Sequence, residues 1–238
     1  MKLDVLAIGA HPDDVELSCG GTIRKLVKQG RIVGICDLTE GELGTRGTVT
    51  IRRSESIEAS NILGTRVREN LGLPDGNIEI NYENRIKLMR VIRRYRPEIL
   101  LFPHTFERHP DHEHAHRLCK EAWFYAGLAK VETEIDGIKQ QAFRPSKYFM
   151  FMQTAEFIPS FIVDISEEYE DRVRAIRAFK SQFHDPESSE PETFLSNPEF
   201  MEFLRTRCEY LGDRIGRKYG EGFASFEPVK VDDLFSLI

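Results

Sequence analysis

The fold expected for this chain follows from one stretch of its sequence, Val5-Leu6-Ala7-Ile8-Gly9-Ala10-His11-Pro12-Asp13-Asp14. The first half of the stretch is an uninterrupted apolar run, which is typical of a parallel β-strand buried on both faces. The run ends in a histidine and two adjacent carboxylates, at the end of the strand where α/β proteins bind their ligands. A second polar cluster, His109-Pro110-Asp111-His112, comes after the apolar run Ile99-Leu100-Leu101-Phe102. Together the two clusters predict one polar site at a single edge of a sheet.

Apolar and amphipathic segments alternate along the first half of the chain. We expect strands over residues 3–8, 32–38, 65–70 and 98–103, and helices over residues 16–29, 51–63 and 83–95. Gly30, Gly64 and Pro97 supply the stop signals after the three helices. This alternation predicts an α/β, Rossmann-like layered fold, with a mainly parallel sheet flanked by helices.

The second half of the chain is less regular. We expect strands over residues 146–152 and 160–164, helices over 167–182 and 201–217, and a turn-rich segment over 220–228. Residues 184–198 are rich in proline and acidic side chains, which indicates either a mobile lid or an ordinary surface loop. The chain has neither an internal repeat nor a low-complexity linker. We therefore expect a single domain over residues 1–238, with its catalytic edge built mostly from residues 1–127.

Composition and charge narrow the classes of function. The chain has 238 residues, of which 40% are hydrophobic and 30% charged, as is ordinary for a globular protein. A formal net charge of -6, without a basic stripe, argues against nucleic acid as a partner. Neither a signal-peptide pattern nor an apolar run of roughly 18 residues is present, and four scattered cysteines without a CxxC pair suit free thiols in a reducing compartment. We therefore expect a cytoplasmic protein that binds neither membranes nor nucleic acid.

His11, Asp14 and His112 form the candidate metal site. Two imidazole nitrogens and one carboxylate oxygen leave a position for water, which is the arrangement of catalytic rather than structural zinc. Zinc in such a site lowers the pKa of its water toward neutrality and polarises a carbonyl group. The same ligands with open positions also suit ferrous iron. His114, close to His112 in the sequence, remains an alternative ligand.

Three further side chains in the two clusters are candidates for catalysis. Asp13, adjacent to a ligand, could take the proton from the attacking water as general base. His109 is placed to stabilise the oxyanion as an imidazolium or to protonate a leaving amine. Asp111 could orient either neighbouring histidine through its second ring nitrogen. The whole set predicts metal-assisted hydrolysis of an amide.

Other interpretations of these residues are weaker. Either cluster alone would be explained by a turn, because proline fixes φ and aspartate bonds to nearby backbone. The sequence lacks the GxGxxG and GxxxxGK[ST] motifs of nucleotide-binding proteins and the GxSxG motif of serine hydrolases. Loss of Asp13 or His109 would have favoured a non-catalytic sugar- or metal-binding module, and the chain keeps both residues.

With these motifs the sequence resembles the PIG-L/LmbE-like family of zinc-dependent N-acetylglucosaminide deacetylases. The matching residues are AHPDD at 10–14, Gly20-Gly21 after it, and HPDH at 109–112. The resemblance implies the same metal ligands, the same general base and the same oxyanion or general-acid histidine as above. It also implies a small N-acetylglucosaminyl substrate and homo-oligomers, hexamers among them.

The resemblance is strongest to the bacillithiol-pathway branch of this family. It rests on the loop TEGELGTRG at 39–47, Arg52 and Glu55 after it, Arg108 before the second cluster, and GEGF at 220–223. This branch implies removal of acetate from N-acetyl-α-D-glucosaminyl L-malate in bacillithiol biosynthesis. Arg52 and Arg108 then become candidate partners for the malate carboxylates, and Glu42 for sugar hydroxyls. Glu107 stands where mycothiol-pathway relatives often carry tyrosine, which counts against that branch.

The substrate has an open alternative. The same chemistry would serve free N-acetylglucosamine, chito-oligosaccharides or another N-acyl sugar conjugate. Rates measured with and without the malate group separate these hypotheses, because a lost carboxylate contact lowers transition-state binding.

Overall fold

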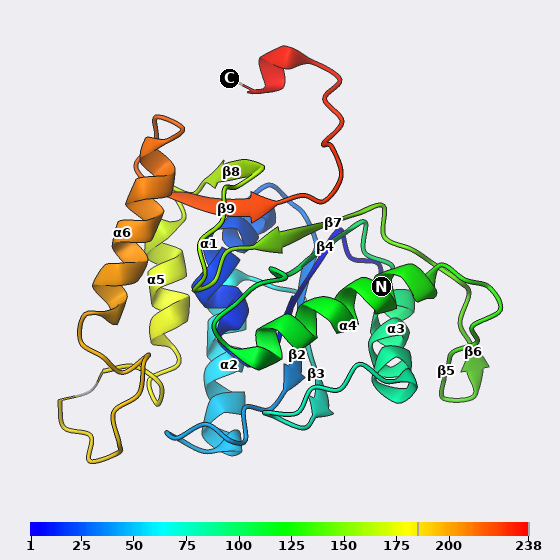
Figure 1. The fold of residues 1–238 in the computed structure, drawn as a ribbon, viewed down its shortest axis with the longest axis horizontal. Helices are drawn as coiled ribbons and strands as arrows, with labels where there is room; N and C mark the ends of the chain where they lie inside the picture. Colours follow the sequence, from blue (N-terminus) through cyan, green and yellow to red (C-terminus); the bar gives the residue numbers. More distant parts are fainter. Residues whose placement is uncertain (185, 238) are drawn as a thin grey trace.

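A seven-stranded sheet forms the centre of the computed structural model, which describes residues 1–184 and 186–237 (Figure 1). Its strands lie in the order β3 (Val67–Leu73), β2 (Val33–Thr39), β1 (Val5–Gly9), β4 (Ile99–Pro103), β7 (Lys147–Phe151), β9 (Gly220–Ala224) and β8 (Phe161–Asp164). The helices are α1 (Asp14–Lys28), α2 (Val49–Leu63), α3 (Tyr82–Tyr95), α4 (Pro110–Ala126), α5 (Tyr169–Arg177) and α6 (Phe200–Asp213), with a short 3-10 helix at Leu234–Leu237. Strands β5 (Glu134–Ile135) and β6 (Ile138–Lys139) form a separate hairpin. This mainly parallel sheet flanked by helices confirms the predicted fold class.

Strand β1 lies at the point where the order of the parallel strands reverses. It pairs in parallel with β2 on one side and with β4 on the other, so that Val5 is level with both Val33 and Ile99. The chain leaves β1 through α1 toward β2 and returns later to β4 on the opposite side. A crevice opens at such a reversal, beyond the carboxyl ends of the two strands, because the connections leave in opposite directions. Both polar clusters follow these two strands.

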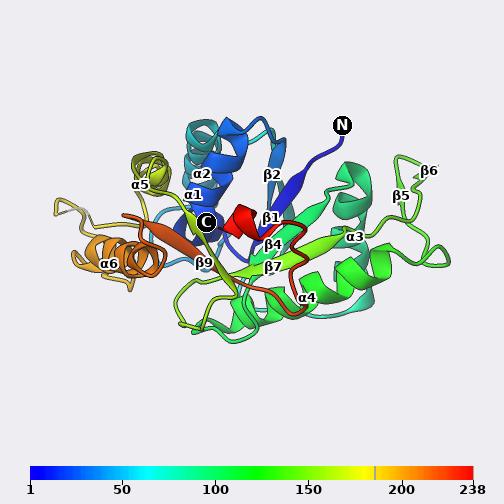
Figure 2. The same ribbon diagram turned by 90° about the horizontal axis from the view of Figure 1, so that it is seen from above.

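Two hydrophobic layers hold the sheet between the helices. Along β1, Leu6 and Ile8 pack into the layer formed with α3 and α4, whereas Val5 and Ala7 pack into the layer formed with α1, α2 and α5. Figure 2 shows α1 and α2 on one side of the sheet and α4 on the other. A strand buried on both faces needs apolar residues at every position, which is why its sequence is continuous rather than alternating.

The second half departs from the predicted elements. Residues 220–228 were expected to form turns, but their first five residues form β9, which is wholly buried and pairs antiparallel with β7 and β8. The first glycine of this strand is needed for packing, since a Cβ at Gly220 would lie 2.7 Å from Ile162 Cγ2. The helices expected over 167–182 and 201–217 end earlier, at Arg177 and Asp213. The β5–β6 hairpin was not expected.

Helix α1 is interrupted at Cys19, whose φ of -142° and ψ of 21° are not helical. The interruption frees the carbonyl of Leu17, which accepts hydrogen bonds from Arg172 Nη2 (2.6 Å) and Arg207 Nη2 (3.0 Å). The Glu221 carboxylate accepts from the two backbone N–H groups of residues 21 and 22, at 2.9 and 2.7 Å. Buried backbone groups need such partners, because an unpaired one costs free energy comparable to a lost hydrogen bond. The first turns of α1 are therefore fixed by side chains from α5, α6 and β9.

The cysteines and the helices can be compared with what the composition predicts. All four cysteines are free thiols in the interior, and burial raises the pKa of each: Cys19, Cys36, Cys119 and Cys208. Across residues 1–184 and 186–237, no helix has the length and apolar character needed to cross a bilayer.

The Gly20-Gly21 pair gives a test of the packing around this interruption. We expect Gly21→Ala to lower the free energy of unfolding by about 1–3 kcal/mol, because its Cβ would lie 2.8 to 2.9 Å from three atoms of Ile165. Gly20→Ala is the matched control, since its nearest neighbour, Arg172 Cγ, is 3.4 Å away. Urea denaturation of the two variants measures the difference. Equal stabilities would show that the α1–Ile165 contact does not constrain the fold.

Candidate active site

The two polar clusters meet beyond the carboxyl ends of β1 and β4. His11 lies in the β1–α1 connection, whereas His109 and His112 lie at the start of α4. The His11 ring centroid is 4.9 Å from that of His109 and 5.4 Å from that of His112, and the latter two are 5.1 Å apart. The single polar site predicted from the two sequence clusters is therefore present as one group of three imidazoles.

The backbone gives Asp13 and Asp14 different environments. Asp13 has a φ of 118°, a conformation that is strained for a residue other than glycine and that marks functional sites in many proteins. Asp14 begins α1, and its Oδ2 accepts the backbone N–H of His11 at 2.8 Å. A side chain at Gly9 would come within 2.9 Å of Asp14 Cβ, so this close turn requires glycine. The sharp turn therefore directs the carboxylates of Asp13 and Asp14 to different places in the site.

His11, Asp14 and His112 offer ligand atoms that lie within 4.8 Å of one another. His112 Nε2 is 3.3 Å from Asp14 Oδ1, and His11 Nδ1 is 3.6 Å from Asp14 Oδ2. Ligands at the usual bond lengths around a tetrahedral zinc ion are separated by about 3.4 Å. Burial alone would raise the pKa of Asp14, but His112 and His11 outweigh it and hold that pKa well below its usual value. The donor types, their spacing and the ionised carboxylate fit a divalent metal.

Two more carboxylates hold the far side of the His11 ring. Its Nε2 donates to Asp75 Oδ1 at 3.0 Å and lies 3.4 Å from Asp111 Oδ2. The same Asp111 oxygen accepts the backbone N–H of Gly76 at 2.7 Å, which connects α4 to the loop after β3. Such contacts fix the orientation of a ligating imidazole. The orienting role predicted for Asp111 fits this contact, whereas Asp75 was missed, although it too follows a strand that ends at this edge.

His109 caps the N-terminus of α4. Its Nδ1 accepts the backbone N–H of Asp111 at 3.2 Å, so the neutral ring must carry its proton on Nε2. Burial lowers the pKa of His109, and the nearby His11 and His112 lower it further. A neutral imidazole that donates from Nε2 therefore fits this position better than the imidazolium considered from the sequence. His11, His109 and Asp111 also form a second set of closely spaced ligand atoms, in which His109 would have to use Nε2 because the cap occupies its Nδ1.

Arg52 lines the cavity and is also paired with a carboxylate of the site. It is buried in the first turns of α2, and its Nη2 donates to Asp13 Oδ2 at 2.9 Å. Burial raises the pKa of Asp13 to about 7, although the Arg52 guanidinium acts in the opposite direction. Loop residue Gly41 packs so closely that a Cβ there would collide with Arg52 Nη1. The guanidinium of Arg52 therefore already has an internal partner, and its contact with a malate carboxylate stays a prediction.

The other two predicted substrate-binding residues, Arg108 and Glu42, lie in different positions relative to the cavity. Arg108 is exposed, lines the cavity and lies with its guanidinium 4.3 Å from the ring centroid of Phe194. Glu42 is not among the described residues that line the cavity, and its Oε1 accepts the backbone N–H of Asp75 at 2.8 Å. The prediction of a sugar contact for Glu42 is thus not supported by its position, because the carboxylate is used to hold the loop after β3.

Gln153 and Glu107 were missed as members of the site. Gln153 follows β7, and its Nε2 donates to Asp14 Oδ1 at 2.5 Å. The buried Glu107 carboxylate accepts backbone N–H groups from residues 153, 154 and 155 at 3.1 to 3.2 Å. These contacts connect the β4–α4 loop to the β7–β8 loop and fix the amide beside Asp14. A lone glutamine after a strand is a weak indication of a site residue. Its position at the same edge of the sheet as the two clusters was the signal that could have identified Gln153.

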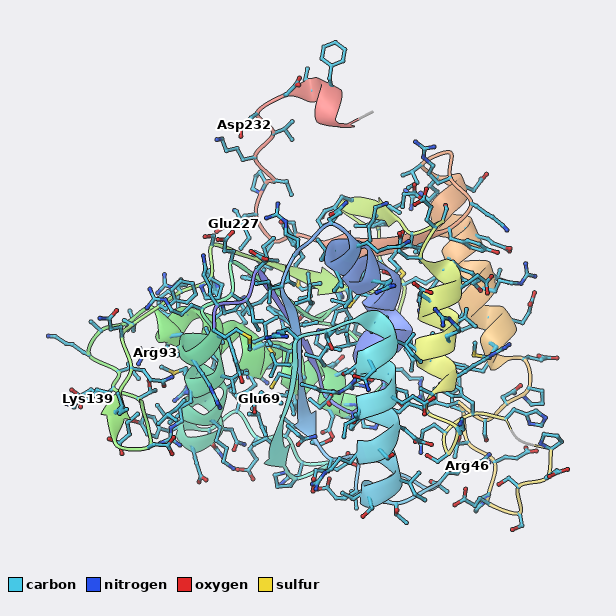
Figure 3. All side chains as sticks on the ribbon, turned by 180° about the vertical axis from the view of Figure 1, so that it is seen from behind. Arg46, Glu69, Arg93, Lys139, Glu227 and Asp232 are labelled. Carbon is cyan, nitrogen blue, oxygen red and sulfur yellow. The ribbon has the colours of Figure 1, made fainter. Side chains whose placement is uncertain are left out.

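A cavity of about 430 Å³ opens over this group. Its floor is formed by the imidazoles and carboxylates of the two clusters, and its outer wall includes Leu43, Phe194 and Phe203. The candidate lid, residues 184–198, is irregular over its described part and ends beside α6, whereas residue 185 lies outside the described residues. Figure 3 labels Arg46, which lies where the loop before α2 meets this segment. The volume is within the range of small-molecule sites.

Comparisons with known proteins agree with this geometry. The sequence profile of the family described as PIG-L, GlcNAc-PI de-N-acetylase, matches residues 6–123, which include both clusters. The diacetylchitobiose deacetylase of Thermococcus kodakarensis is 34% identical over 232 residues, covering 92% of this chain and 81% of that protein. The crystal structure of a conserved protein, TT1542, from Thermus thermophilus has a TM-score of 0.87 and 38% identity, covering 96% of this chain and 97% of that one.

The comparisons do not single out the bacillithiol-pathway branch of the family. A probable N-acetyl-α-D-glucosaminyl L-malate deacetylase 2 of Bacillus cereus is 27% identical over 195 residues, covering 76% of this chain and 84% of that protein. This similarity is lower than that to the diacetylchitobiose deacetylase. The family resemblance is confirmed, and with it hydrolysis of an N-acetylglucosamine-type substrate. The chain belongs to the PIG-L family and is a metal-dependent, hydrolytic N-deacetylase.

Proposed function

We propose that this enzyme removes acetate from an N-acetylglucosamine unit of a chito-oligosaccharide, of which diacetylchitobiose is the simplest. The observation that carries the chemistry is the convergence of the metal-binding group with Asp13 and His109 on the floor of one cavity. The choice of substrate is supported by the similarity to a diacetylchitobiose deacetylase over 92% of the chain. It is also supported by the engagement of Arg52 with Asp13, since one cation expected to bind malate already has an internal partner.

We assign the metal to His11, Asp14 and His112, with zinc as the first candidate and ferrous iron as the alternative in the cell. When bound, zinc supplies Lewis acidity toward the carbonyl oxygen of the acetamide. Asp75 and Asp111 hold His11 from its other nitrogen, and the Gln153 amide holds Asp14. These outer contacts keep the three ligand atoms in place before the metal arrives.

Asp13 acts as the general base in this proposal. It removes a proton from the attacking water as the water oxygen bonds to the acetyl carbon, and later gives that proton to the departing amine nitrogen when the C–N bond breaks. The products are acetate and a free amino sugar. A pKa of about 7 suits both tasks, because the carboxyl can accept and release the proton near neutral pH. Arg52 fixes its orientation and favours its ionised form.

His109 acts as a neutral hydrogen-bond donor. Its Nε2–H is directed by the cap at Nδ1, and it stabilises the negative charge that develops on the acetyl oxygen. Removing one such donor typically costs about a hundredfold to a thousandfold in kcat. Asp111 contributes by orienting His11 and by supplying the backbone N–H that fixes the His109 tautomer.

Deacetylation of N-acetyl-α-D-glucosaminyl L-malate is the second candidate function. The exposed Arg108 guanidinium at the cavity favours it, since arginine is a preferred partner for carboxylates. The 27% identity to a probable malate-conjugate deacetylase also supports it.

Acetate release separates the two substrates. We expect kcat/KM for diacetylchitobiose to exceed that for the malate conjugate by about tenfold or more, because Arg108 is the one exposed arginine among the described residues that line the cavity, whereas malate carries two carboxylates. Purified enzyme loaded with zinc and assayed for free acetate gives both values. A preference for the malate conjugate would reverse the choice of substrate while leaving the proposed chemistry intact.

The role of Asp13 has its own test. Asp13→Asn should lower kcat by about a hundredfold or more while zinc content stays near that of the native protein, because a proton acceptor is lost and the metal ligands remain. Asp136→Asn is the matched control, since Asp136 also has a positive φ (52°) but lies in the β5–β6 turn. Near-native kcat in the Asp13 variant would contradict the assignment of the general base.

The metal assignment is tested with two histidines of the same helix. We expect His112→Ala to lose bound zinc, measured by elemental analysis after dialysis, because one of three ligands is removed. His114→Ala, at the more exposed neighbouring position, should keep its zinc. The reverse pattern would make His114 the ligand.

A further inference from the structure

The cavity over the active site has two chemically different parts. Its floor carries the imidazoles and carboxylates of the proposed catalytic group. Its outer wall is formed by apolar side chains of the segment before α6 and of α6 itself, principally Phe194 and Phe203. The acetamide of a monosaccharide on the floor uses the polar groups, whereas the aromatic wall is suited to a second, less polar surface.

The aromatic wall is held in place from both sides. The Arg108 guanidinium lies 4.3 Å from the Phe194 ring centroid, and Phe200 meets the Phe194 ring edge-on at 5.2 Å. Phe203 lies near Phe200, with ring centroids 6.2 Å apart, and the Arg207 guanidinium is 5.6 Å from its ring centroid. Cation–π and edge-to-face contacts of this kind orient the rings.

The backbone that carries Phe194 is also attached to the rest of the protein. Glu190 Oε1 accepts the backbone N–H of Gly47 at 3.0 Å, and its Oε2 lies 3.6 Å from Arg46 Nε. Next to Phe194, the N–H of Thr193 donates to Ser196 Oγ at 2.7 Å. The wall is therefore positioned before any ligand binds, which lowers the ordering cost of binding.

Both rings nevertheless leave much of their surface uncovered. Phe194 is 44% exposed and Phe203 is 39% exposed, although each lines the cavity. The face of a phenyl ring carries partial negative charge and attracts weakly positive C–H groups. One face of a pyranose ring presents such C–H groups, while the hydroxyls at its rim remain in water.

We propose that Phe194 and Phe203 form a subsite for the sugar ring that is linked to the deacetylated N-acetylglucosamine unit, an inference that rests on the proposed function. The subsite makes this enzyme selective for a disaccharide or longer chain over the monosaccharide. It favours a pyranose over malate as the linked group, since a dicarboxylate has no apolar face to cover two phenyl rings. Three arginines are among the described residues that line the cavity: Arg52 is paired with Asp13, Arg207 donates to the Leu17 carbonyl, and Arg108 is exposed.

The test compares two sugars in one set of variants. Phe194→Ala should raise KM for diacetylchitobiose about five- to tenfold with kcat changed less than twofold, and should leave KM for N-acetylglucosamine within twofold. Phe194→Tyr, which keeps the ring, should restore the native KM. Phe203→Ala should show the same selectivity, and Phe226→Ala, a ring that is 72% exposed in the C-terminal segment, should change neither sugar.

A binding measurement covers the case in which the monosaccharide is not turned over. In the Asp13→Asn protein, calorimetry gives dissociation constants for both sugars, and Phe194→Ala in that background should weaken only diacetylchitobiose. Equal losses for both sugars, or none, would overturn the subsite. A larger loss for the malate conjugate than for diacetylchitobiose would assign the wall to that ligand instead. Absence of both turnover and binding with either sugar would overturn the proposed function itself, whereas normal turnover with no Phe194 effect overturns only the subsite.

Discussion

The central position of β1 is the constraint on which the rest of the structure depends. Its side chains must fill a hydrophobic layer on each face, and its backbone must pair with β2 and β4 at once. A strand held in this way has no freedom to shift its register by one residue without exchanging the two layers. The residues immediately after Gly9 are consequently delivered to one fixed place. The polar groups needed for hydrolysis meet beyond the end of β1, because β4 ends beside β1 and is followed by the second polar cluster.

Backbone geometry, rather than residue type, separates the tasks of neighbouring groups in this site. Asp13 and Asp14 are chemically identical, yet one faces Arg52 and the other faces two imidazoles. Their pKa values move in opposite directions for this reason, since burial dominates at Asp13 and the imidazoles dominate at Asp14. His109 differs from the other two imidazoles because it caps a helix. Pairs of titratable groups driven apart by their surroundings are a general route to acid–base function.

The sequence was informative where a residue acts within a local pattern and uninformative where it acts at a distance. Continuous apolar runs predict β1 and β4, and the polar clusters after them predict the groups that meet. The strand β9 was mistaken for a turn because Gly220 is required by Ile162, a neighbour far away in the chain. Asp75, Gln153 and the Arg52–Asp13 pair escaped prediction for the same reason, since each depends on a loop that only the folded sheet brings near.

The interruption of α1 at Cys19 makes this helix depend on residues that are synthesised much later. Every metal-binding and acid–base group proposed above lies within the first half of the chain, and the family profile ends at residue 123. The turns of α1 that carry Asp14, however, are completed by Arg172, Arg207 and Glu221. A nascent chain that has just left the ribosome with both histidine clusters would still lack these partners. The backbone groups of α1 beside Asp14 therefore gain these hydrogen-bond partners only after α5, α6 and β9 have been synthesised.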